Sequence, residues 1–219
     1  MQQEILLNFP ILDRKPYNKQ FVYYSMFSEK AVSRVVSAIE ASPNGIATLE
    51  LLGSLRICGR DSLKTALSRL NKAGGILRLK RGVYSSNPMR DAFACAQATY
   101  NGYLAFSSAL YLHGMATEMP FAITVATVST SEVKRFGQNE FCAVAMKGRA
   151  VGFERKGAYV VSTRAKTLFD CLYLPRYSVE REKLEAAWRT LSPADKKEFA
   201  GYARKLAPNR RDIHDFAKH

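Results

Sequence analysis

A pair of adjacent glycines, Gly74 and Gly75, separates two hydrophobic patterns in this chain of 219 residues. Before the glycines, residues 61–73 place apolar side chains at helical spacing. Directly after them, two short β-rich runs, 76–79 and 83–84, are joined by the three residues "KRG", which predicts a tight hairpin. A helix that stops abruptly and is followed at once by a hairpin is compatible with few small folds.

Signals upstream of the glycines predict two more helices. Ser28 is expected to cap a first helix that ends before Pro43, and Thr48 to cap a short second helix. After a break, Asp61 is expected to cap the third helix. Helix, short helix, turn, helix and hairpin is the order of a winged helix-turn-helix, which we assign to residues 28–87.

The positive charge of the chain is concentrated in this predicted unit. The sequence has 33 Lys and Arg against 19 Asp and Glu, a net charge of +14. Residues 56–81 alone hold eight cations and one acid, Asp61. The outward face of the third helix is polar and cationic with no glutamate, whereas ordinary solvated helices mix the two signs. A local excess of this kind favours a polyanionic partner.

The resulting hypothesis is binding of double-stranded DNA. The third helix is expected to enter the major groove, other cations to hold phosphates, and the hairpin tip to lie along the backbone or in the minor groove. The alternative is a basic but merely solvated surface. The predicted DNA-binding residues are Arg56, Arg60, Ser62, Lys64, Thr65, Ser68, Arg69, Lys72, Lys80 and Arg81.

The rest of the chain predicts a second domain of the α+β class. Residues 85–88 are interpreted as the loop that leaves the winged helix, and 88–101 as a connector helix. Several strand candidates follow in succession, and three helical patterns occupy most of the chain after residue 163, so we expect an α+β domain over 102–219. Residues 1–27 form an N-terminal extension without an assigned role.

Catalysis has little support in the sequence. The common nucleotide-binding, hydrolase and zinc-protease motifs are absent, and the four cysteines include no C-x-x-C pair. Glu154 and Lys156 form an E-x-K pattern seen in metal-dependent nucleases, but no aspartate occurs between Asp91 and Asp170 to complete a metal site. His113, at a predicted helix end, is assigned a structural role. We therefore predict no catalytic residue, no metal ligand and no cofactor.

The chain is expected to be cytoplasmic. No apolar run approaches the roughly 18 residues that a membrane-spanning helix requires. The N-terminus carries Glu4 where a secretory signal would carry cations. We expect no membrane association.

Three stretches of the chain form a recognisable set: "GGILRLKRGVY" (74–84), "LAFSSALYLHGM" (104–115) and "VSTRAKTLFDCL" (161–172). Together, and in this order, they resemble the AbiEi-type antitoxins of toxin–antitoxin and abortive-infection systems. In the third, Lys166 stands where the family pattern has an arginine, four residues before Asp170.

The resemblance implies two activities. Members of that family bind inverted repeats in their own promoter through the winged helix and repress it. Their second domain neutralises a co-encoded nucleotidyltransferase-like toxin. Two other functions remain open: a plain winged-helix transcription factor whose second domain senses a ligand or dimerises, and a metal-dependent nuclease that uses Glu154 and Lys156.

Overall fold

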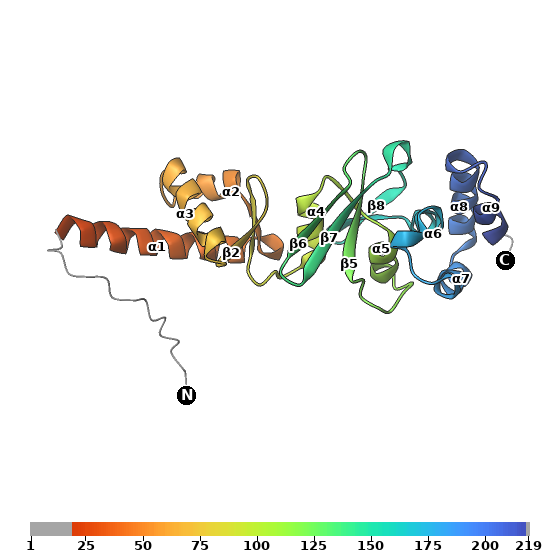
Figure 1. Cartoon of the computed structure of the whole chain (residues 1–219), viewed down its shortest axis with the longest axis horizontal. Helices are drawn as coiled ribbons and strands as arrows, with labels where there is room; N and C mark the ends of the chain where they lie inside the picture. The colour runs from red at the N-terminus through yellow and green to blue at the C-terminus, as the bar shows by residue number, and fades with distance from the viewer. Residues whose placement is uncertain (1–18, 218–219) are drawn as a thin grey trace, which may run out of the picture.

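The computed structural model describes residues 19–217, so residues 1–18 of the predicted N-terminal extension lie outside the described part. In this part of the chain, helices surround a three-stranded sheet and a six-stranded sheet, which makes the fold α+β. The small sheet and the first helices lie at one end, the large sheet in the middle and the last helices at the other end (Figure 1).

The N-terminal unit follows the predicted order of helices and hairpin. Its elements are α1 (Lys19–Ala41), β1 (Ile46–Thr48), α2 (Leu49–Ser54), α3 (Arg60–Lys72), β2 (Ile76–Lys80) and β3 (Val83–Ser86). The strands form an antiparallel sheet in the order β1-β3-β2. The hairpin turns through Arg81 and Gly82, and Gly82 has a φ of 77°, a conformation that glycine adopts without strain.

Two of the three predicted helix starts are wrong. α1 begins at Lys19, so Ser28 lies inside the helix, and the predicted domain boundary between residues 27 and 28 falls within it. The N-cap of α3 is Gly59; Asp61 lies in the first turn, where a carboxylate is favoured by the helix dipole. The prediction for α2 is confirmed, because Thr48 Oγ1 accepts a hydrogen bond from the Leu51 N–H at 3.1 Å.

The predicted exit loop over residues 85–88 also needs correction. Ser85 and Ser86 belong to β3 and are buried. Because β3 is the central strand, it pairs with both neighbours and is covered by the next helix, so polar residues there are enclosed. Their hydroxyl groups are satisfied locally: the Ser86 hydroxyl donates to the Pro88 carbonyl at 3.0 Å.

The larger sheet is mixed and has the strand order β6-β7-β5-β4-β9-β8. Parallel pairs join β5 to β7 and β4 to β9, and the other pairs are antiparallel. The elements are α4 (Ala92–Thr99), β4 (Gly102–Leu104), α5 (Phe106–Leu112), β5 (Ala122–Thr127), β6 (Glu132–Phe136), β7 (Asn139–Ala145), β8 (Phe153–Lys156), β9 (Tyr159–Ser162), α6 (Arg164–Tyr173), α7 (Arg181–Arg189), α8 (Pro193–Leu206) and α9 (Arg211–Phe216).

The predicted connector helix, α4, is packed between the two sheets. One hydrophobic cluster joins Leu79 of β2 to Phe93 of α4 and to Val125 of β5. The side chain of Gln97 exchanges hydrogen bonds with the backbone of Val160 in β9, at 3.0 and 3.1 Å. The two predicted domains therefore share a core across α4, and the hairpin packs on the larger unit through Leu79 and Val83, which lie close to its turn.

The C-terminal segment completes the second core. Ile213 and Phe216 of α9 are buried, and the Phe216 ring lies 5.7 Å from the ring of Trp188 in α7. Residues 211–216 of the basic tail thus form a helix that covers this core. In the described part of the chain, no helix is long and apolar enough to cross a membrane.

A buried ion pair lies inside α6. Lys166 and Asp170, one turn apart, are both fully buried, and the Lys166 ammonium donates to Asp170 Oδ1. The second carboxylate oxygen, Oδ2, has no hydrogen-bond partner in the described part of the chain. Burial raises the pKa of Asp170 to about 6 and lowers the pKa of Lys166, so the loss of water outweighs the attraction between the two charges.

This pair predicts a specific pH dependence of stability. Because the pKa of Asp170 is about 6 in the fold against an ordinary 3.8, the folded state holds an extra proton between these values. The stability that this extra proton contributes to the folded state is therefore fully present below about pH 4 and is lost as the pH rises to about 6. Urea unfolding at several pH values between 4 and 6 measures this effect. The free energy of unfolding of wild type should fall by up to about 1.4 kcal/mol per pH unit relative to that of Lys166→Met/Asp170→Leu. A constant difference over this range would contradict the expectation.

Candidate nucleic-acid interface

A concave surface lies between α3 and the β2–β3 hairpin. We call it the basic groove; its volume is about 770 Å³. It is closed at one end by the first residues of α2, which lie beside Gly82 in the hairpin turn, and the Leu49 N–H donates to the Gly82 carbonyl at 2.8 Å. The residues that line it are Leu49, Glu50, Arg60, Lys64, Ser68, Asn71, Lys72, Arg78, Arg81, Gly82 and Tyr84.

The helix side of the groove is one stripe of α3. Arg60, Lys64 and Ser68 are spaced four residues apart and therefore lie above one another on the helix. The opposite face buries Leu63 and Leu67 in the core of the N-terminal unit, which fixes the orientation of the stripe. The alternation of apolar and cationic residues in the sequence thus directs the cations toward the hairpin.

The hairpin side is formed by β2 and the turn. Arg78 and Arg81 line the groove, and the Arg78 N–H donates to Asn71 Oδ1 at 2.8 Å, which ties the strand to α3. The register of β2 against β3 shifts between Arg78 and Lys80, as in a β-bulge. A bulge changes the direction of the side chains that follow it, so Lys80 does not share the face of Arg78.

The ten predicted DNA-binding residues separate into three sets. Arg60, Lys64, Ser68, Lys72 and Arg81 line the groove. Another four, Arg56, Ser62, Thr65 and Arg69, are exposed but are not part of its lining. Lys80 faces away from the groove toward the larger sheet, where its Nζ lies 3.5 Å from Asn101 Oδ1.

Sequence reasoning missed six of the lining residues, and Arg78 and Asn71 are the two of these that bear on DNA binding. The alternation in "ILRLK" was a usable signal, because Ile76 is buried against α3 and Arg78, two residues later, leaves the sheet on the same side. Asn71 gave no signal of its own, because its role depends on the distance between α3 and β2.

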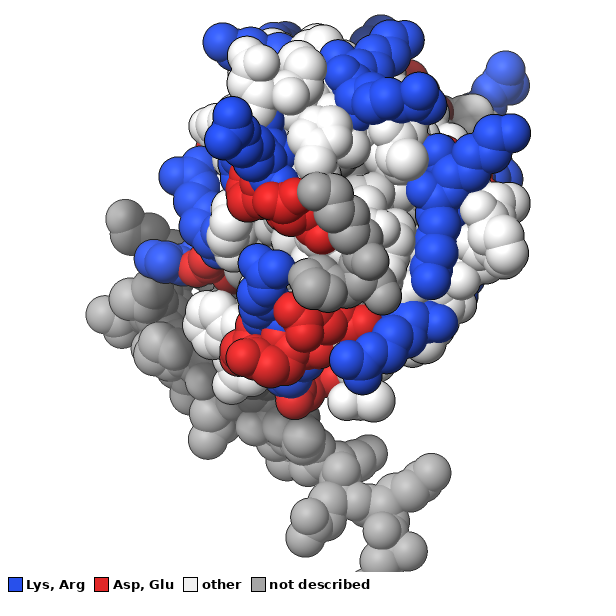
Figure 2. Space-filling view, turned by 90° about the vertical axis from the view of Figure 1, so that its right-hand side faces the viewer, with Lys and Arg blue, Asp and Glu red and all other residues white. Residues whose placement is uncertain are grey.

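Acidic residues are few around the groove. Glu50 is the one acidic residue in its lining, and Asp61 contacts Lys64 at 3.2 Å in an exposed pair. The opposite end of the molecule, formed by the C-terminal helices, carries acidic side chains between its Lys and Arg side chains (Figure 2). There Arg181 pairs with Glu185 at 3.1 Å. Residues 56–81, with eight cations and one acid, are therefore more one-sided in charge than the C-terminal helices, where the two signs are mixed.

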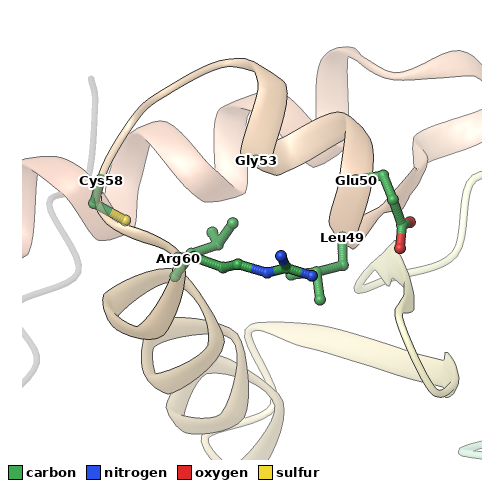
Figure 3. A pocket seen from close by; sticks show the side chains of 6 residues that line it. Leu49, Glu50, Gly53, Cys58 and Arg60 are labelled. Atoms are coloured by element: carbon green, nitrogen blue, oxygen red, sulfur yellow. The ribbon is translucent and has the colours of Figure 1, made fainter.

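A smaller pocket of about 320 Å³ lies behind the groove, between α2 and the start of α3. Arg60 belongs to the lining of both hollows, and its side chain extends across the pocket toward Leu49 (Figure 3). The half-buried Cys58 and the buried Leu63 form other parts of its wall. The pocket places the Arg60 guanidinium near the groove while its aliphatic stem covers apolar surface.

Of the two residues of the nuclease alternative, Glu154 is exposed on β8 and Lys156 has structural partners. Lys156 Nζ donates to the Leu112 carbonyl at 2.8 Å and lies 3.3 Å from His113 Nδ1. His113 Nε2 lies 2.7 Å from the Ser162 carbonyl oxygen, and burial lowers the pKa of the imidazole. Lys156 and His113 therefore hold β8 and β9 to the end of α5. Among residues 19–217, no group of His, Cys, Asp and Glu is arranged to hold a metal ion.

No family model matches the chain, and no curated protein is significantly similar to it.

The second and third stretches of the antitoxin resemblance lie side by side in the larger unit. β4 and β9 are parallel neighbours with Leu104 opposite Val161, and α5 packs on α6. Ser162 Oγ and Thr167 Oγ1 share a hydrogen bond of 2.7 Å inside this unit. The two stretches thus form one packed core, whereas the first forms the hairpin beside the groove.

Proposed function

We propose that the chain is a DNA-binding autorepressor of the winged helix-turn-helix type that also acts as an antitoxin. The observation that carries the DNA-binding part is the basic groove, in which five cations from α3 and the hairpin face one another across a hollow: Arg60, Lys64, Lys72, Arg78 and Arg81. Backbone phosphates supply most of the affinity of DNA-binding proteins, and such a groove is suited to them.

The winged-helix assignment rests on the order of elements. α2, a turn and α3 are followed by a hairpin, and β1 pairs with β3 to complete a small sheet. In this arrangement α3 takes the place of the recognition helix and the β2–β3 hairpin that of the wing. The role suggested for Ser68 is contact with base edges, and for Lys72, Arg78 and Arg81 contact with phosphates.

The antitoxin part is supported by the family resemblance alone. Toxin neutralisation is assigned to the larger unit, with a nucleotidyltransferase-like toxin as partner. The competing function, a transcription factor with a sensing or dimerising second unit, uses the same groove and differs only in this unit. The close packing of α4 between the two sheets favours neither, because both functions need a rigid connection.

Growth rescue tests the antitoxin part. Expression of the neighbouring gene product should arrest growth, and co-expression of this chain should restore it. Because the toxin function is assigned to the larger unit, a Lys64→Gln/Arg81→Gln variant should rescue growth as well as wild type does while losing repression of a reporter. If neither wild type nor the variant rescues growth and wild type still represses the reporter, the chain is a plain transcription factor.

A further inference from the structure

The bulge in β2 places one cation of the hairpin outside the groove, at the junction of the two sheets. Lys80 is half-buried there, and its Nζ lies 3.5 Å from Oδ1 of Asn101, an exposed residue between α4 and β4. Among the described residues, no carboxylate lies within ion-pair distance of Lys80. The junction thus holds a partly desolvated ammonium group without a counter-charge.

A second cation, on the larger sheet, lies near enough to act on Lys80 through its charge. Lys134 of β6 lies with its Nζ 5.5 Å from the centre of the Tyr100 ring, next in sequence to Asn101. It contacts Glu132 at 3.3 Å and its side chain is 32% exposed. Burial, together with the charge of Lys134, lowers the pKa of Lys80. The two ammonium groups therefore repel each other, and Glu132 is the one carboxylate among residues 19–217 that is paired with either.

We propose that Lys80, Asn101 and Lys134 form a phosphate-binding site that holds the DNA backbone beside the wing. A phosphate group would accept hydrogen bonds from both ammonium groups and from the Asn101 amide, and its charge would remove their repulsion. The inference rests on the proposed DNA-binding function. It adds a contact from the larger unit, outside the winged helix.

The turn of the hairpin decides on which side of the wing this phosphate site lies. Arg81 faces the basic groove, whereas Lys80, the preceding residue, faces the larger sheet. The wing therefore presents cations on both of its sides, and a phosphate can be held on each. β6 then lies along the DNA backbone, and the orientation of the larger sheet relative to the duplex is fixed.

The test compares two charge-matched double variants of the full chain. Lys80→Gln/Lys134→Gln removes the site, and Lys197→Gln/Lys205→Gln removes two exposed cations of α8 at the far end of the molecule. Binding to a mixed-sequence duplex of about three helical turns is followed by fluorescence anisotropy over a series of salt concentrations. The first variant removes one phosphate contact, so it should lower the slope of log K against log salt by about 0.9 and the affinity roughly tenfold, and the second should match wild type.

Asn101→Asp distinguishes a phosphate-binding site from a polar cluster that only stabilises the packing of the hairpin on the larger unit. A carboxylate between two lysines should raise the melting temperature, because it neutralises their repulsion, and it should weaken DNA binding roughly tenfold, because it occupies the phosphate's place. If Asn101→Asp raises the melting temperature but leaves DNA binding unchanged, the cluster only stabilises the hairpin and the proposal is wrong.

The same binding measurements distinguish a failure of this phosphate site from a failure of the proposed DNA-binding function. If Arg78→Gln/Arg81→Gln weakens binding while Lys80→Gln/Lys134→Gln matches the α8 control, the junction site is wrong and the groove stands. If the wild-type chain does not bind the duplex, both are wrong.

Discussion

Replacing Asp170 by alanine is expected to lower the free energy of unfolding by about 3–5 kcal/mol, because it leaves the fully buried Lys166 ammonium without its counter-charge. For a chain of this size the melting temperature should fall by about 6–20 °C. Urea unfolding followed by circular dichroism measures the change. The pair lies in α6, against α8 and the larger sheet, so the loss should affect the whole C-terminal unit.

The control is an ion pair of the same spacing on the surface. Arg181 and Glu185 are also four residues apart in a helix, but both are exposed, and Glu185→Ala should cost no more than about 0.5 kcal/mol. The double variant Lys166→Met/Asp170→Leu should recover wild-type stability or exceed it, because it removes both desolvated charges. A double variant as unstable as Asp170→Ala would mean that packing, and not the unpaired charge, explains the loss.

Replacing Arg78 and Arg81 together by glutamine is expected to produce the largest loss of DNA binding. Both line the basic groove, and neither lies within ion-pair distance of a carboxylate of the described residues, so each is free to contact a phosphate. Losing two phosphate contacts should lower the salt slope by about 1.8 and the affinity roughly tenfold or more. Anisotropy titrations with the upstream DNA at several salt concentrations measure both quantities.

Arg78 is the more informative of the two residues. Its side chain is exposed while its backbone N–H is bonded to Asn71, so Arg78→Gln should leave the hairpin folded. The variant should weaken binding about equally for all sequences, as expected of a phosphate contact, whereas Ser68→Ala should relax sequence preference with little change in the salt slope. If Arg78→Gln and Arg81→Gln both bind like wild type, DNA does not occupy the groove.

The features that the sequence predicted correctly depend on neighbouring residues. Thr48 caps α2 within one helical turn, and Gly74, with a φ of 74°, follows the end of α3. The hairpin was predicted because "KRG" separates two β-rich runs and Gly82 supplies the left-handed turn. Each of these signals acts over a few residues, so an isolated segment contains it in full.

The failures have a different physical origin. β6 has no strand pattern in the sequence because it is an edge strand with exposed charged residues and no clear apolar face, and β1 has none because three residues hold too little pattern. Ser85 and Ser86 were assigned to a loop because serine is common in loops, whereas the neighbours of β3 on both sides enclose them. The start of α1 was misplaced because a serine that resembles a cap lies inside a longer helix.

The sequence by itself determined the α+β class, the order of helix, turn, helix and hairpin, and the concentration of cations between residues 56 and 81, because spacing, capping and charge are local properties. Only the tertiary structure decided which cations face one another. A bulge directs Lys80 away from the groove and Asn71 anchors Arg78 beside it, and both depend on the approach of elements that are separate in sequence. The same holds for Lys166 and Asp170: their spacing permits a pair, but only burial by the surrounding helices makes that pair costly to break.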